Sequence, residues 1–166
     1  GISQDVEADD SILELTKARL PWLVLALLGG FVSVKVLGLF GGAMTNHGNL
    51  FFFTPLVAAM AGNVGVQSSA IIVQGLANDT LSGSLFNRLI KEVSLSLLNG
   101  VILATILFLG SHFLLNVEFI IGIIVTIALI SVIIIASLIG TFVPILLDKF
   151  GIDPALATGP FITTSN

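Results

Sequence analysis

The polar residues best placed to do chemistry lie inside a long apolar stretch, in the run from Pro55 to Ser69 and just beyond it. On a helix that turns 100° per residue, Asn63, Gln67 and Gln74 fall within about 40° of one another. Amides inside hydrocarbon need hydrogen-bonding partners. One stripe of three amides therefore indicates either a water-lined passage or a hydrogen-bonded seam between helices, and the sequence leaves both open.

Small residues occupy a different face of the same stretch. Ala58, Gly62, Gly65 and Ser69 cluster there, and small side chains let another backbone approach closely. The Gly-Asn-x-Gly-x-Gln pattern at 62–67 also adds local flexibility, and a helix loosened at this point would aim backbone carbonyls at an ion. One face therefore suits packing, and the other offers polar atoms.

A second polar group lies at the C-terminal end of the sequence. Asp153 followed by Pro154 is a good helix start, with Asp as the N-cap and Pro as the first helical residue. Gly159 and Pro160 then interrupt the helix, and residues 163–166 are all polar. Irregular polar backbone at membrane depth is tolerated only against protein or a water-filled cavity.

The remaining acids and histidines do not indicate catalysis. Glu92 and Glu118 lie just inside predicted spans, where interfacial carboxylates are common. His47 and His112 fall in predicted outer loops without a paired acid or thiol, so we expect no transition-metal site of the His/Cys kind. The sequence also lacks a visible constellation of nucleophile, base and oxyanion donors. We therefore predict that the protein is not an enzyme.

The elements that must position these residues are membrane spans. Hydrophobic residues make up 55% of the sequence and charged residues 10%, whereas a soluble domain carries about 25% charged residues. The apolar blocks reach the length of about 20 residues that a helix needs to cross the hydrocarbon core. Short loops between them favour an antiparallel helical bundle. The predicted spans are residues 20–40, 50–77, 85–110 and 117–147, with a partial fifth at 154–166.

We therefore predict an all-α membrane protein, a bundle of five transmembrane helices with the fifth truncated. As a helix, residues 154–166 would cover only about 20 Å of the ~30 Å hydrocarbon core. Residues 1–18 are predicted to be a cytoplasmic juxtamembrane connecting segment, and residues 19–166 the pore domain.

Positive charge predicts the orientation. The loops expected on one side hold five of the six Lys and Arg residues, namely Lys17, Arg19, Arg88, Lys91 and Lys149. By the positive-inside rule this side is cytoplasmic, which puts the N-terminus in the cytoplasm. Lys35 is the exception, and its stem lets the ammonium reach the membrane interface. The net charge of −4, without a basic stripe, makes a nucleic-acid partner unexpected.

Three stretches resemble the membrane domain of the MgtE family of magnesium transporters. They are Arg19 to Leu23, Pro55 to Ser68, and Gly151 to Leu156 with Gly159-Pro160 and a Thr/Ser run after it. The resemblance implies a homodimer of five-helix subunits in a bacterial inner membrane, with the ion pathway between subunits lined by the second and fifth helices. It also implies cytosolic domains, including CBS domains that sense Mg²⁺, ahead of a connecting helix, which residues 2–18 would match.

The resemblance also carries over residue roles. Asp153 matches an acid that helps bind regulatory Mg²⁺ at the cytoplasmic mouth, and Thr163 matches a position whose backbone carbonyl faces the pore. Gly159 stands where relatives often have Asn, so a side-chain ligand is missing there. The family's pore carboxylate would follow Asn166. The predicted metal-binding set is Asp153, Asn63, Gln67, Gly159, Thr163 and Asn166.

The physical chemistry of these groups suits Mg²⁺. This ion prefers octahedral oxygen ligation at about 2.0–2.1 Å and keeps several of its waters, so amides, hydroxyls and carbonyls serve as outer-sphere partners. The sequence therefore predicts a homodimeric, channel-like pore for hydrated Mg²⁺, although the same groups would accept Mn²⁺ or Co²⁺. An ion-coupled secondary transporter, which also uses broken helices, and a non-transporting structural membrane subunit are the alternatives.

Overall fold

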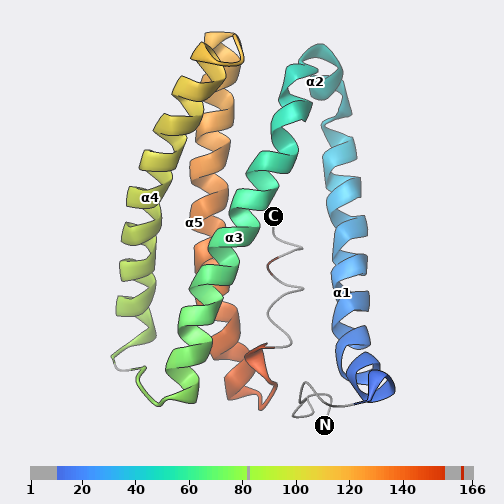
Figure 1. The fold of residues 1–166 in the computed structure, drawn as a ribbon, viewed down its shortest axis with the longest axis vertical. Helices are drawn as coiled ribbons and strands as arrows, with labels where there is room; N and C mark the ends of the chain where they lie inside the picture. Colours follow the sequence, from blue (N-terminus) through green and yellow to red (C-terminus); the bar gives the residue numbers. More distant parts are fainter. Residues whose placement is uncertain (1–10, 82, 156–161, 163–166) are drawn as a thin grey trace.

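The structure, a computed structural model, describes residues 11–81, 83–155 and 162 (Figure 1). Its helices are α1 (Ile12–Leu39), α2 (Gly41–Asn46), α3 (Asn49–Ala77), α4 (Leu85–Phe113) and α5 (Phe119–Lys149). All but the short α2 are long and apolar enough to cross a membrane. The 29-residue α3, for example, reaches about 44 Å at 1.5 Å per residue. The predicted all-α fold and its first four spans are confirmed.

The α1 helix begins well before the predicted first span. Ser11 caps its first turn, because the Ser11 hydroxyl accepts a hydrogen bond from the backbone N–H of Glu14 at 3.4 Å. The Glu14 carboxylate in turn accepts one from the backbone N–H of Ser11 at 3.1 Å, which completes a capping box. Part of the predicted connecting segment is therefore one continuous helix with the first span.

Helix α5 is the centre of the bundle, with α3 and α4 packed against it (Figure 1). Leu129 and Ile133 of α5 are buried with Ala104 of α4 in one apolar cluster. Ile121 of α5 and Phe53 of α3 belong to a second cluster, which lies near the N-terminal end of α5. Because α5 contacts both neighbours, its side chains are the most deeply buried of the four long helices.

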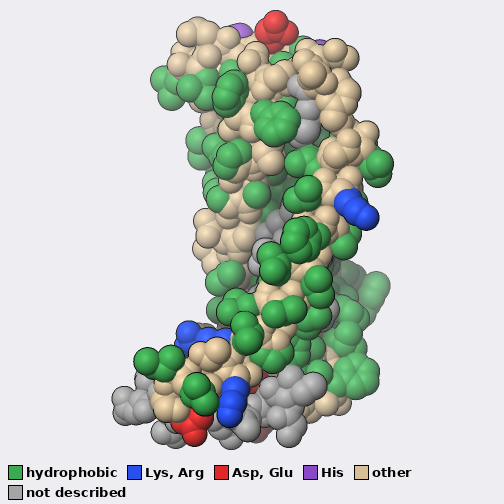
Figure 2. All heavy atoms as spheres, turned by 90° about the vertical axis from the view of Figure 1, so that its right-hand side faces the viewer, with side chains coloured by type: hydrophobic (Ala, Val, Ile, Leu, Met, Phe, Trp, Pro, Cys, Tyr) green, Lys and Arg blue, Asp and Glu red, His purple; other side chains and the backbone are tan. Residues whose placement is uncertain are grey.

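Helix α1 stands apart from this three-helix core. Only 6% of its most apolar stretch is buried, against 33% for α5. Trp22 of α1 packs against Leu147 near the end of α5. The face that α1 presents in Figure 2 is mostly hydrophobic over the middle of the molecule, with most charged groups near its lower end. This distribution suits a surface that faces lipid or other apolar helices.

Two tight turns direct the chain back into the bundle at the lower end of Figure 1. Between α3 and α4, Gly83 has a φ of +93°, and Ser84 caps α4 by accepting a hydrogen bond from the backbone N–H of Asn87. After α5, Gly151 has a φ of +68°, and the backbone N–H of Ile152 donates to the carbonyl of Leu147 at 3.0 Å. Gly fits both positions because it lacks the Cβ that disfavours positive φ.

Candidate functional site

The amide stripe of the sequence is an exposed face of α3. The side chains of Asn63, Gln67 and Gln74 are all exposed. Within the part of the chain that the structure describes, none of these amides has a hydrogen-bond partner. They are therefore free to meet water, an ion or another subunit.

The backbone of this face is regular. Helix α3 is continuous from Asn49 to Ala77, with Pro55 inside it, so the suggestion of a helix loosened at 62–67 is wrong. In a continuous helix the carbonyls in this stretch are used by the i to i+4 ladder. The polar atoms that α3 offers are thus its side-chain amides rather than freed carbonyls.

The opposite face of α3 packs on α5 through glycine. A Cβ added at Gly140 of α5 would overlap the carbonyl oxygen of Gly65 and lie 3.1 Å from the Cβ of Ser68. Gly65, Ser68 and Ser69 are all buried here. Two of the predicted small residues, Gly65 and Ser69, therefore lie on the packing face, whereas Ala58 is exposed.

Hydrogen bonds between side chains also join the three core helices. The hydroxyl of Ser68 on α3 donates to the carboxylate of Glu92 on α4 at 2.5 Å. One turn further along α4, the hydroxyl of Ser96 donates to that of Ser137 on α5, which is fully buried. These hydroxyls and the half-buried carboxylate connect all three core helices.

The sequence did not predict this polar cluster. We expected Glu92 to be an interfacial carboxylate, and its spacing from Lys91 and Arg88 gave no hint of Ser68, which is 24 positions away. A possible signal was that Glu92 and Ser96 lie four residues apart and share one helix face. Asn99, an exposed amide in the middle of α4, was also not singled out.

The predicted residues at the C-terminal end are only partly described. Asp153 is half-buried, and its carboxylate accepts a hydrogen bond from the backbone N–H of Ala155 at 2.9 Å, as expected of a helix cap. Gly159, Thr163 and Asn166 lie outside the described residues, and so does most of the predicted fifth span.

Ile162 is the one described residue after position 155, and it reaches the middle of α3. Its side chain is 4% exposed. A Cβ added at Gly65 would lie 2.7 Å from the Cγ2 atom of Ile162. Ile162 therefore contacts α3 close in sequence to Gln67 and Asn63.

The described residues do not assemble a dense metal site. Among residues 11–81, 83–155 and 162, no group of three or more His, Cys, Asp or Glu side chains lies close enough to hold an ion. His112 instead lies 3.4 Å from the backbone carbonyl of Val117, measured from its Nδ1 atom.

In the described part of the chain, four helices are long and apolar enough to cross a membrane, which defines a multi-pass helical membrane protein. Comparison of the sequence with known families identifies the family within this class. Residues 54–166 match the MgtE family, described as divalent cation transporters, and the chain belongs to this family. Its members are transporters rather than enzymes.

Bacterial relatives agree with this assignment. The chain is 34% identical to the magnesium transporter MgtE of Bacillus subtilis, and the match covers 98% of this chain. It is also 34% identical to the magnesium transporter MgtE of Enterococcus faecalis, over 95% of this chain. It is 32% identical to the magnesium transporter MgtE of Thermus thermophilus over 89%. The matches cover 36%, 35% and 32% of those proteins, so the chain spans about a third of their length.

Proposed function

We propose that this chain forms the membrane pathway of a Mg²⁺ transporter, with the amide face of α3 lining the route of a hydrated ion between two copies of the subunit. The homodimer, the channel-like mechanism and the choice of Mg²⁺ are all parts of this proposal. The relatives support Mg²⁺, because each of the three is named a magnesium transporter.

One observation carries the proposal: Asn63, Gln67 and Gln74 are exposed on a membrane-spanning helix and have no hydrogen-bond partner among the described residues. An unpaired amide in hydrocarbon costs several kcal/mol. A face with three of them is therefore expected to meet water or a second polar surface rather than lipid. A pathway between two subunits supplies both.

The chemistry of the face fits a hydrated divalent cation. Mg²⁺ gives up its waters reluctantly, so its transport favours oxygens that hydrogen-bond to the hydration shell. The amide oxygens of Asn63 and Gln67 can accept such bonds, and the backbone carbonyls of Gly159 and Thr163 would do so from the fifth segment. Asn166 completes the proposed lining. Asp153 would bind regulatory Mg²⁺ at the mouth of the pathway.

The same proposal includes a membrane topology. Lys17, Arg19, Arg88, Lys91 and Lys149 would face the cytoplasm of a bacterium, with the protein in its inner membrane and the N-terminus inside. Regulatory cytosolic domains would then precede residue 12 on that side. This arrangement also puts Asp153, which follows Lys149 closely, on the cytoplasmic side.

Ion flux per folded protein tests the pathway. The full-length transporter, reconstituted in liposomes with a Mg²⁺-sensitive dye, would be compared with its Asn63→Leu and Gln67→Leu variants. Each substitution removes one outer-sphere hydrogen bond worth about 0.5–1.5 kcal/mol, so we expect flux to fall about two- to twelvefold. Ile71→Leu, an apolar exchange at an exposed position of α3, serves as the control and should keep wild-type flux.

Other results would point to the alternatives. Unchanged flux per folded protein in both amide variants, with a lower melting temperature, would contradict the pathway and favour a hydrogen-bonded seam. Flux that requires a second ion in fixed ratio would identify a coupled carrier. Absence of flux in the wild type would leave only a structural role.

A further inference from the structure

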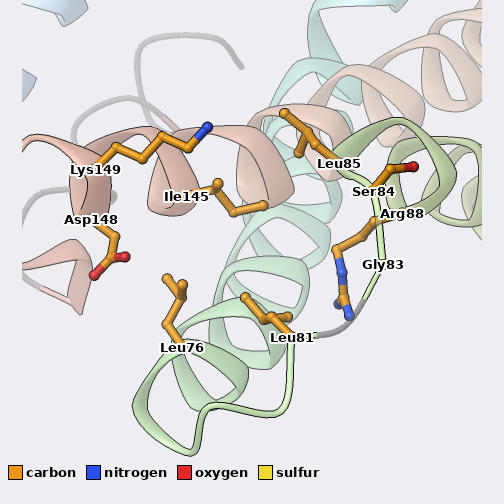
Figure 3. Close-up of a pocket in the computed structure, with 9 residues that line it drawn as sticks. All are labelled: Leu76, Leu81, Gly83, Ser84, Leu85, Arg88, Ile145, Asp148 and Lys149. Atoms are coloured by element: carbon orange, nitrogen blue, oxygen red, sulfur yellow. The ribbon is translucent and has the colours of Figure 1, made fainter.

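A separate cavity lies at the lower end of the bundle, where α3 and α5 end and α4 begins (Figure 3). It encloses about 280 Å³. Its walls come from all three core helices and from the connection between α3 and α4. Neither the amide face nor Asp153 belongs to it, so the proposed ion pathway does not account for this cavity.

The charged side chains of the cavity are Arg88, Lys149 and Asp148. Arg88 is half-buried, and neither it nor Lys149 forms an ion pair among the described residues. In Figure 3 the guanidinium of Arg88 and the carboxylate of Asp148 lie on opposite sides of the view. With two cations and one anion the lining has a net charge of +1, which would neutralise one phosphodiester.

The rest of the lining is largely apolar. Leu76, Leu81 and Ile145 stand between the charged groups in Figure 3. A small soluble phosphate would leave these walls without a partner, whereas a phosphate joined to hydrocarbon would cover them. The cavity also lies at the ends of membrane-spanning helices, which is the depth at which phospholipid headgroups are found.

We propose that this cavity binds the phosphodiester headgroup of an anionic phospholipid, with Arg88 and Lys149 contacting the phosphate and Leu76, Leu81 and Ile145 contacting the start of an acyl chain. Basic pockets between transmembrane helices bind anionic lipid headgroups in this way. Arginine is well suited to the role because its planar fork can donate two parallel hydrogen bonds to phosphate oxygens. The start of α4 adds the positive end of a helix dipole.

A bound lipid would connect the start of α4 to the end of α5. Arg88 lies on the first turns of α4, and Lys149 is the last residue of α5. The phosphate would therefore bridge two helices that carry like charges at this end. We expect the lipid to raise the melting temperature of the protein as well as to bind measurably.

Native mass spectrometry of the full-length protein in detergent, titrated with phosphatidylglycerol, tests the site. The variant with Arg88→Gln and Lys149→Gln should bind about thirtyfold more weakly at this site, because each cation near an anionic lipid contributes about fivefold. The matched control is Lys91→Gln with Lys35→Gln, which also removes two charges but at exposed positions outside the cavity. Its affinity should stay near that of the wild type.

Each single variant, and Arg88→Lys, would be measured as well, so that poor folding of the double variant does not decide the result. Retained charge in Arg88→Lys should recover part of the affinity. Equal weakening in the cavity variant and the control would overturn the site. Equally tight binding of phosphatidylethanolamine, or of glycerol phosphate without acyl chains, would overturn the assignment to an anionic lipid.

Discussion

The two faces of α3 have opposite relations to the rest of the chain. On one face, Gly65 and Ser68 are buried against α5 and α4, with a backbone contact at Gly140 and a hydrogen bond to Glu92. On the other, Asn63 and Gln67 are exposed and have no partner within the described residues. Both faces contain small or polar residues, but only the first uses them for packing.

This contrast distinguishes two kinds of polar residue on a membrane helix: those that pack against neighbouring helices, and those that we propose meet the ion. Hydroxyls such as Ser68 and Ser96 are short and find acceptors on neighbouring helices, so their burial is compensated. The amides are longer, carry both donors and acceptors, and have no hydrogen-bond partner among the described residues. We therefore expect changes on the packing face to alter stability, and changes on the amide face to alter transport.

The largest effect on stability should come from Gly140→Val. The added side chain would meet the carbonyl of Gly65, and backbone cannot move aside as a flexible side chain can. Overpacking of this kind costs about 1–3 kcal/mol, so the melting temperature in detergent should fall by several degrees. The control is Gly110→Val on α4, where an added Cβ meets nothing within 4 Å. Equal melting temperatures for the two variants would contradict the close crossing of α3 and α5.

A smaller effect should follow loss of the hydrogen bond between Ser68 and Glu92. A double-mutant cycle with Ser68→Ala and Glu92→Ala, each of which removes one partner of the bond, should give a coupling energy of about 1 kcal/mol in thermal unfolding. Ser94→Ala is the matched control on α4, since the Ser94 hydroxyl bonds only within its own helix, to the carbonyl of Ile90. Additive effects of Ser68→Ala and Glu92→Ala would mean that the two side chains do not interact.

The smallest effect on stability should come from the amide face itself. Asn63→Leu and Gln67→Leu remove exposed groups that have no partner in the part of the chain that the structure describes, so each should change the free energy of unfolding by no more than about 0.5 kcal/mol. Thermal unfolding and size-exclusion chromatography would measure stability and assembly together. A destabilisation as large as that of Gly140→Val would place these amides in a seam between helices and remove the contrast between the faces.

The spans could be predicted from sequence because lipid imposes a length on each apolar block. The predicted span 50–77 compares with α3 at Asn49–Ala77, and 85–110 compares with α4 at Leu85–Phe113. Helix α1 was harder, because its first turns mix apolar residues with charged ones and continue into the span as one helix. Helix α2 is a short helix of six residues, Gly41–Asn46, in a stretch that the sequence predicts as a loop.

The packing partners could not be predicted in the same way. Periodicity divided α3 into two faces, and Gly65 and Ser69 were assigned to the packing face, where they are buried. It could not identify Gly140 or Glu92 as their neighbours, because contacts between helices depend on rotation and depth, which a single sequence does not specify. The roles of Asn63, Gln67 and Asp153 in binding Mg²⁺ stay predictions.

Thiol labelling compares the two faces of α3 most directly, since the chain has no native cysteine. Single cysteines would be placed at Gln67, at buried Ser69, and at exposed but apolar Leu98 of α4, and treated with a membrane-impermeant thiol reagent. We predict fast labelling at position 67 only, slowed by millimolar Mg²⁺, because that side chain would face a water-filled ion pathway. Labelling at position 67 no faster than at position 98, or unaffected by Mg²⁺, would contradict the pathway.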